Sequence, residues 1–335
     1  MWALLVVAAV AVAGLIYGAN TGGKRTVGAR TATQAASPPA APVKEPRAAA
    51  PAPPRLIARL AGSLPAPVQA PAAAPLPGGR VLLMGGLDPS FVSVAGVEVA
   101  GGGRAHAVGS LPVPTHDAAA AGAPGGAYFF GGGEPSKDAI LEVTAGGRVT
   151  SAGRLPVAAS DVAVAELRGR YYVVGGYTGT RALSTIVEWR PGAKARVVAH
   201  MPVALRYAAV ATAGDRIVIA GGSAGTAASR AVYSFDPANR GLHRIATLPR
   251  PLTHSSAASL SGVVYLLGGR DAAQGTQTRR VLAVDPRTGR VRRAGRLPRA
   301  VSDAGAAAVP GAILLAGGRD AAGTPIADVV RLVVR

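Results

Sequence analysis

The sequence predicts an all-β fold, a ring of six blades known as a six-bladed β-propeller, and two repeated markers indicate it. The first marker is a short apolar run that ends in a pair of glycines, and it occurs six times in 335 residues. Successive pairs lie 46, 44, 46, 47 and 49 residues apart. Their first members are Gly85, Gly131, Gly175, Gly221, Gly268 and Gly317. A fixed period of this length with strand-like runs is typical of propeller blades.

The second marker is Leu or Met followed by proline, and it keeps the register of the first. The glycine pair follows the proline after 20 residues in the first unit and after 19 residues in the other five. The prolines are Pro65, Pro112, Pro156, Pro202, Pro249 and Pro298. Two markers in register over six units indicate a structural repeat.

Each unit is predicted to form four short strands, as the fourth unit illustrates. Turn residues such as Gly214-Asp215 separate its apolar or alternating runs, and a loop is expected at Ser223 to Ser229. The predicted strands are 208–213, 217–220, 231–235 and 242–247. We expect the glycine pairs to supply positive φ and bare backbone where neighbouring blades come close, which is a structural role.

The two ends of the repeat region predict how the ring closes. After Gly317-Gly318 the last unit has one more strand, Asp328 to Val334, and no fourth strand. A strand-like run, Leu56 to Ala61, precedes the first unit. We predict that this N-terminal strand completes the last blade and leaves no open edge, so that the propeller spans residues 56–335.

These repeats resemble the kelch repeat. The resemblance rests on the strand ending in Gly-Gly, the alternating third strand and the last strand running into Leu-Pro, and it covers all six units. It implies a divergent bacterial kelch-like propeller. Kelch units usually carry a tryptophan about seven residues before the proline, a position that here holds Ala58, Ala105, Val149, Ala195, Leu242 and Val291. Aliphatic packing between blades is therefore expected, with Trp189 and Phe235 as partial substitutes.

The amino-acid composition excludes several kinds of chemistry. The chain has no cysteine, which excludes disulfides, thiol catalysis and zinc–thiolate sites. Its five histidines are scattered without metal-ligand spacing. We therefore expect no metal, no cofactor and no assigned catalytic residue.

The net charge of +19 raises the question of an anionic partner. Part of the charge gathers in the fifth unit, at Arg279, Arg280, Arg287, Arg290, Arg292, Arg293 and Arg296. A basic edge that holds an anionic polymer is one interpretation, and a solvated blade edge is the other. Nucleic-acid binding is not expected, because no aromatic stacking platform accompanies the arginines.

The N-terminus is predicted to be a separate segment. Trp2 to Tyr17 is apolar and uncharged, which indicates a signal peptide or an N-terminal membrane anchor over residues 1–19. Residues 20–55 are rich in Ala and Pro and resemble an extended linker. The basic residues Lys24, Arg25 and Arg30 lie after the apolar run, which conflicts with export by the positive-inside rule. We expect a domain anchored outside the cytoplasmic membrane, or alternatively a secreted one, and a monomer.

Candidate site residues lie where each innermost strand begins. The fourth and fifth residues after each proline are polar in five of the six units. These pairs are His116-Asp117, Ser160-Asp161, Arg206-Tyr207, Thr253-His254 and Ser302-Asp303, whereas the first unit has Gln69-Ala70. Ring closure predicts that the ten side chains gather at one mouth of the central channel.

Two interpretations of this cluster are open. In the structural one, the aspartates accept backbone hydrogen bonds or tie neighbouring blades together. In the functional one, Arg206 clamps a charge, Tyr207 stacks on a ligand, and His254 with Asp303 forms an acid–base pair. The leading functional hypothesis is a non-enzymatic module that binds a protein or glycan at the cell envelope. The alternative is a small-molecule enzyme, similar to kelch-like sugar mutarotases or epimerases, acting at the channel mouth.

Overall fold

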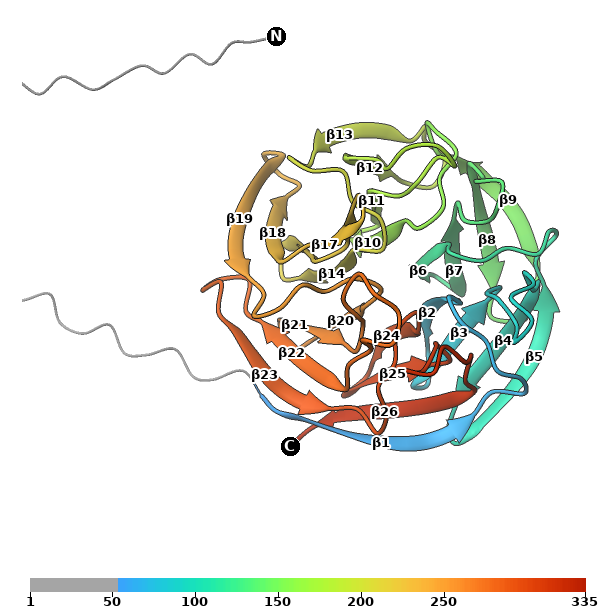
Figure 1. The fold of residues 1–335 in the computed structure, drawn as a ribbon. Helices are drawn as coiled ribbons and strands as arrows, with labels where there is room; N and C mark the ends of the chain where they lie inside the picture. Colours follow the sequence, from blue (N-terminus) through green and yellow to red (C-terminus); the bar gives the residue numbers. More distant parts are fainter. Residues whose placement is uncertain (1–53) are drawn as a thin grey trace, which may run out of the picture. The chain divides into compact units, whose positions relative to one another are not determined.

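The computed structural model describes residues 54–335, which form a ring of six four-stranded antiparallel sheets (Figure 1). No helix occurs among these residues, and so none of them belongs to a helix that could cross a membrane. The predicted all-β, six-bladed propeller is confirmed. The predicted segment 1–19 and the linker up to residue 53 lie outside the described part of the chain.

Five blades are built from consecutive segments, with the innermost strand first. Blade 1 contains β2 (Ala72–Leu76), β3 (Arg80–Met84), β4 (Gly96–Gly101) and β5 (Arg104–Ser110). Blade 2 contains β6 (Ala119–Ala123), β7 (Gly126–Phe130), β8 (Ala139–Thr144) and β9 (Val149–Arg154). Blade 3 contains β10 (Ala163–Leu167), β11 (Arg170–Val174), β12 (Thr185–Trp189) and β13 (Arg196–His200). Blade 4 contains β14 (Ala209–Ala213), β15 (Arg216–Ala220), β18 (Ala231–Asp236) and β19 (Gly241–Thr247). Blade 5 contains β20 (Ser256–Leu260), β21 (Val263–Leu267), β22 (Arg280–Val284) and β23 (Val291–Arg296).

Blade 6 joins the two ends of the described chain. Its inner strands are β24 (Gly305–Val309), β25 (Ala312–Ala316) and β26 (Asp328–Val334). Strand β1 (Leu56–Ser63) pairs antiparallel with β26, from Leu56 opposite Val334 to Ser63 opposite Asp328. The first strand of the described chain is therefore the outermost strand of the last blade, the place that the sequence analysis predicts for it (Figure 1).

The strand directions give the ring two different faces. One face carries the loops after the glycine pairs and the Leu-Pro connections between blades, and we call it the mouth face. The other carries the tight turns within each blade. Strand β1 starts at this opposite face, where Arg335 N donates a hydrogen bond to Arg55 O at 2.9 Å. Both ends of the described chain therefore lie away from the mouth face.

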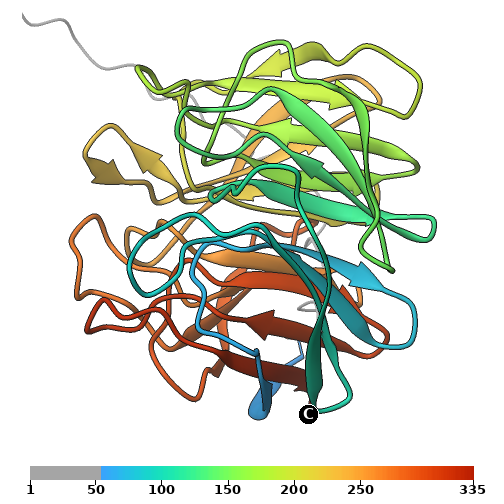
Figure 2. The ribbon, with the colours of Figure 1, turned by 90° about the vertical axis from the view of Figure 1, so that its right-hand side faces the viewer.

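One short hairpin departs from the repeat. The sequence predicts a loop over Ser223 to Ser229, but the structure forms strands β16 (Ser223–Ala224) and β17 (Ala227–Ala228) there. Gly225, with φ of +61°, permits the two-residue turn between them. The hairpin projects from the mouth face of blade 4 and is seen at the left of Figure 2.

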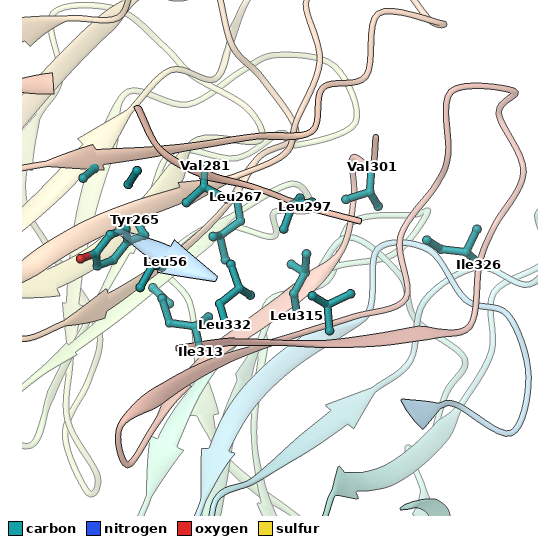
Figure 3. Packing of buried hydrophobic residues seen from close by; sticks show 14 residues of the cluster. Leu56, Tyr265, Leu267, Val281, Leu297, Val301, Ile313, Leu315, Ile326 and Leu332 are labelled. Carbon is teal, nitrogen blue, oxygen red and sulfur yellow. The ribbon is translucent and has the colours of Figure 1, made fainter. Parts of the chain in front are cut away.

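The core consists of apolar layers between neighbouring blades. Leu56 of β1 packs with Tyr265, Val281 and Leu332 between blades 5 and 6 (Figure 3). Aromatic packing gathers between blades 2 and 3, where Trp189 lies 4.8 Å from Tyr128 between ring centroids. Elsewhere the layers are mostly aliphatic.

The glycine pairs lie at the junctions between neighbouring blades. In all six pairs the second glycine donates its N–H to a carbonyl at the start of the next blade, as Gly222 does to Leu252 O at 2.9 Å. The first glycine has φ near +60°, and an added Cβ would collide with that same carbonyl oxygen, as Gly221 shows with Leu252 O. The structural role that we predicted for the pairs is confirmed.

Candidate functional site

The second residue of each predicted pair has a left-handed backbone. The φ values lie between +52° and +56° in all six blades. The residues are Ala70, Asp117, Asp161, Tyr207, His254 and Asp303. This conformation turns the chain from the Leu-Pro connection into the innermost strand, and it points six equivalent positions to the channel axis.

Backbone hydrogen bonds link these positions around the channel. The amide of Asp161 donates to Asp117 O at 2.7 Å, and the amide of Tyr207 donates to Asp161 O at 3.1 Å. The amide of Asp303 donates to His254 O at 3.0 Å, and the amide of Ala70 donates to Asp303 O at 2.7 Å. The main chain therefore fixes the mouth independently of the side chains.

These six residues line a cavity of about 130 Å³ at the centre of the mouth face. The first residue of each pair lies behind it instead. Ser160, Arg206, Thr253 and Ser302 each form a β-bridge to the residue that follows a glycine pair, and His116 O accepts a hydrogen bond from Gly133 N at 2.6 Å. The structure thus brings the second residues of the pairs together around one space and places the first residues in the wall.

Contacts with two neighbouring residues hold the Arg206 side chain in the wall of the site. Its Nε donates to Oδ2 of Asp161, which belongs to the preceding blade and is buried. Its guanidinium also lies over the Tyr177 ring, 3.9 Å from the centroid. This arrangement is the tie between blades that the structural interpretation predicts, and it leaves Arg206 little freedom to clamp a ligand.

Tyr207 and His254 stack across the junction of blades 4 and 5. Their ring centroids are 3.8 Å apart and the planes differ by 24°. The Tyr207 hydroxyl donates to Oδ2 of Asp117 at 3.3 Å. Burial and the charges of Tyr207's acidic neighbours, Asp117 first, raise its pKa, so the hydroxyl keeps its proton.

His254 is neutral and both of its ring nitrogens have neighbours. Nδ1 lies 3.0 Å from Thr253 Oγ1, and Nε2 lies 3.1 Å from an Nη2 of Arg270. Burial, followed by the positive charge of Arg270, lowers the pKa of His254 to about 2. Asp303 Oδ1 is 3.8 Å from Nε2, but a nitrogen that accepts from an arginine is a poor general base. This geometry does not favour the acid–base pair that the functional interpretation expects.

The carboxyl groups of Asp117 and Asp303 are held at an energetic cost. Burial raises the pKa of both, and the charges of Asp161 and Asp303 raise that of Asp117 further. For Asp303, the hydrogen bond from Ser302 and the charges of Arg270 and Arg319 oppose the effect of burial without cancelling it. Asp303 accepts one hydrogen bond, from Ser302 Oγ at 2.6 Å. Burial also raises the pKa of Asp161, even though Arg206 opposes this effect. Two of the three carboxyl groups therefore face the cavity without an ion pair to an arginine.

The equivalent position in the first blade shows that the fold does not need these aspartates. Ala70 adopts the same backbone conformation and makes the same type of hydrogen bond to its neighbour. Tyr207 and His254 occupy the position in two other blades. The backbone thus accepts several side chains, and the left-handed conformation does not require the negative charge of the aspartates.

A further set of residues, outside the predicted site residues, follows the glycine pairs rather than the prolines. Tyr177, Ser223 and Arg270 occupy the first place after their glycine pairs, and each contacts the polar pair of a neighbouring or the same blade. Ser223 Oγ, for example, lies 2.8 Å from Thr253 Oγ1. The register of the glycine pairs is the signal that identifies this set.

The central channel continues behind the mouth as a space of about 660 Å³ lined mainly by alanines of the innermost strands. Small side chains there let six inner strands converge on one axis. No group of three or more His, Asp or Glu suited to a metal ion occurs in residues 54–335. The aspartates, Tyr207 and His254 thus lie at the mouth, whereas small side chains dominate the channel behind it.

Comparison with known proteins supports the fold alone. No protein-family model matches the chain, and no curated protein matches its sequence. In contrast, 647 solved chains resemble the structure, so the likeness is too widespread to indicate a function. One of them, "Structure of YjhT", has a TM-score of 0.68 and 16% sequence identity, and the match covers 80% of this chain and 96% of that one. A likeness at this low sequence identity supports the six-bladed β-propeller fold and nothing further.

Proposed function

We propose that this protein is a non-enzymatic binding module, displayed outside the cytoplasmic membrane, that recognises a protein or glycan through the mouth face. We further infer that its ring is a divergent kelch-repeat propeller, on the strength of the glycine pairs and the Leu-Pro steps. The proposal rests chiefly on one observation. Asp117 and Asp303 face the cavity with raised pKa values at positions where Ala70 shows that alanine suffices. Groups that cost stability without serving the fold are characteristic of binding sites.

The cavity size favours recognition of a projecting group. A space of about 130 Å³ is close to the roughly 150 Å³ that accommodates benzene. It lies below the range of about 300 to 1,000 Å³ usual for pockets that enclose a whole small ligand. The mouth therefore suits one hydroxyl-rich or amide-bearing group of a larger partner, held by the carboxyl groups and the Tyr207 hydroxyl, while the rest of the partner lies across the loops.

The position of the chain ends supports display. The described chain starts at the opposite face, so the segment that precedes it joins the ring away from the mouth. Exposed apolar side chains in a loop of the mouth face, Phe91 at 50% and Val92 at 58% exposure, offer contact area on the same face as the cavity. Such side chains are common at sites of protein association.

A sugar mutarotase or epimerase is the second candidate, because His254 lies 3.8 Å from Asp303 within the mouth. It ranks lower because His254 is neutral and contacts Thr253 and Arg270 through both nitrogens. Adding reducing sugars to the protein and following anomer exchange by NMR distinguishes the two. Turnover that requires His254 contradicts the binding proposal.

Binding is tested with a printed glycan array and the full chain. We expect selective binding that falls at least about tenfold in Asp117→Asn and Asp303→Asn, because each variant loses a charged hydrogen-bond acceptor. Thr150→Ala, on the exposed outer edge of blade 2, is the matched control and should bind like the wild type. Equal binding by all four proteins contradicts a role for the mouth.

A further inference from the structure

The outer edge of blades 5 and 6 carries six arginines that form no ion pair. They lie on the neighbouring strands β22, β23, β26 and β1 and are Arg280, Arg292, Arg293, Arg296, Arg331 and Arg59. None of them belongs to an ion pair found in residues 54–335. We call this surface the arginine edge.

The two blades present the arginine edge as one surface. Strands β23 and β1 run side by side along the rim (Figure 1). They approach so closely that a Cβ added to Gly295 of β23 would lie 2.6 Å from Leu56 O of β1. Only the smallest residue fits there, and the arginines on either side of this contact share one stretch of the rim.

Like charges face one another within the arginine edge. Arg59 is directly opposite Arg331 across β1 and β26, and Arg280 is directly opposite Arg296 across β22 and β23. Like charges in such cross-strand positions destabilise a sheet. An anionic partner that lies against this surface relieves the repulsion.

Blade 3 shows the opposite arrangement with the same fold. There Arg196 of the outer strand is directly opposite Glu188, and Nη2 lies 2.9 Å from Oε1. Arg170 joins the same carboxylate at 2.7 Å. On blade 2, Arg154 pairs with Asp138 at 3.0 Å. The propeller therefore pairs these three arginines of blades 2 and 3 with carboxylates, whereas the six arginines of the arginine edge have no carboxylate partner within residues 54–335.

We propose that the arginine edge docks on a lipid bilayer with anionic headgroups. Two observations favour a bilayer as the partner. The chain joins the ring at Arg55, next to β1, so residues 1–53 lead directly to this edge. Strands β1, β22, β23 and β26 also carry no aromatic residue on which nucleic-acid bases would stack. The choice of a bilayer draws on the membrane attachment proposed above, whereas the charge asymmetry stands without it.

The expected strength follows from the number of arginines. Each Lys or Arg close to an anionic membrane strengthens binding to it. Three of them together change the partition coefficient of the protein by about a hundredfold at low salt. The attraction decays over a Debye length of roughly 10 Å at 0.1 M salt. Docking at the edge leaves the mouth face free for its own ligand.

Vesicle partitioning of the full chain tests the proposal. The edge variant carries Arg292→Glu, Arg293→Glu and Arg296→Glu. A control variant carries Arg148→Glu, Arg168→Glu and Arg190→Glu, which make the same change in net charge on exposed positions of blades 2 and 3. Vesicles are made of phosphatidylcholine, with and without phosphatidylglycerol.

We expect the edge variant to bind the anionic vesicles at least about a hundredfold more weakly than the wild type at low salt, and this difference to shrink as salt is added. The control variant should lose far less. All three proteins should bind neutral vesicles equally, since they share residues 1–53.

The proposal is overturned if the edge and control variants lose equal affinity, or if single-stranded DNA occupies the edge and vesicles do not displace it. Circular dichroism checks folding, and the milder pair Arg292→Gln with Arg293→Gln replaces the edge variant if it does not fold. Glycan-array binding by the edge variant remains at the wild-type level, so failure here and failure of the mouth site are told apart.

Discussion

At the scale of a single residue, Asp303 illustrates that a carboxyl group in the polar cavity lowers the stability of the folded protein. Its side chain is partly buried, that burial is the main cause that raises its pKa, and Ser302 Oγ donates a hydrogen bond to it. Asparagine at this position keeps an acceptor for Ser302 and suits the left-handed backbone at least as well as aspartate does. The charge is therefore the part that folding does not require.

Asp303→Asn is expected to stabilise the protein at pH 7 by about 1 kcal/mol, a common gain when a functional charge is removed. For a carboxyl group whose pKa is raised on folding, the stabilising effect of its protonated form is complete below the ordinary value of 3.8 and is lost as the pH rises through the raised folded pKa. The gap between variant and wild type should thus be present at pH 7 and close below pH 3.8. Urea unfolding at both pH values measures it. Lower stability of the variant at pH 7 would show that the carboxylate supports the fold and would remove the main argument for a binding role.

At the scale of the blade, the glycine pairs hold the ring together through bare backbone. Gly221 and Gly214 are a matched comparison, since both have φ of +64°. A Cβ at Gly221 would collide with Leu252 O of the next blade, whereas a Cβ at Gly214 would meet nothing within 4 Å.

We expect Gly214→Ala to cost about 1 kcal/mol, the strain of a left-handed alanine. Gly221→Ala adds a clash with backbone and should cost well over 3 kcal/mol, in the range of severe core defects. Thermal and urea unfolding of the two variants give the difference. Equal costs would mean that the junction relaxes freely and that positive φ alone explains the glycine.

The sequence was informative about elements that repeat and uninformative about contacts that do not. The last strand, Asp328–Val334, was predicted with its observed bounds, and β1 starts at the predicted residue. The hairpin β16–β17 was missed because blade 4 alone carries it. Each outer strand also contains a bulge, such as the one beside Val281 and Leu282, and bulges leave no simple mark in an apolar pattern.

The sequence predicted the position of the site but not the contacts among its side chains. Register placed Asp117, Asp161 and Asp303 at one mouth. It did not show that Arg206 is already paired with Asp161, or that Arg270 reaches His254. Those contacts depend on side-chain directions across blade junctions, which spacing along one chain does not encode.

At the scale of the whole molecule, the proposed functions lie on different surfaces. The mouth face holds the polar cavity and the exposed loops, the opposite face holds both ends of the described chain, and the rim of blades 5 and 6 carries the arginine edge. This division predicts that partner contacts concentrate on the mouth face. Phe91 lies there, over the Arg319 guanidinium at 5.0 Å, whereas Thr288 lies exposed in the turn between β22 and β23 at the opposite face.

The most direct measurement places a photo-reactive benzoylphenylalanine at one of these two positions in the full-length protein and irradiates the cells that produce it. We expect a discrete cross-linked partner, protein or glycan, from position 91 and none from position 288. The position-91 product should be lost when Asp117→Asn and Asp303→Asn are added. Cross-links of equal yield from both faces, or a position-91 product that survives loss of the two carboxylates, would contradict recognition through the mouth.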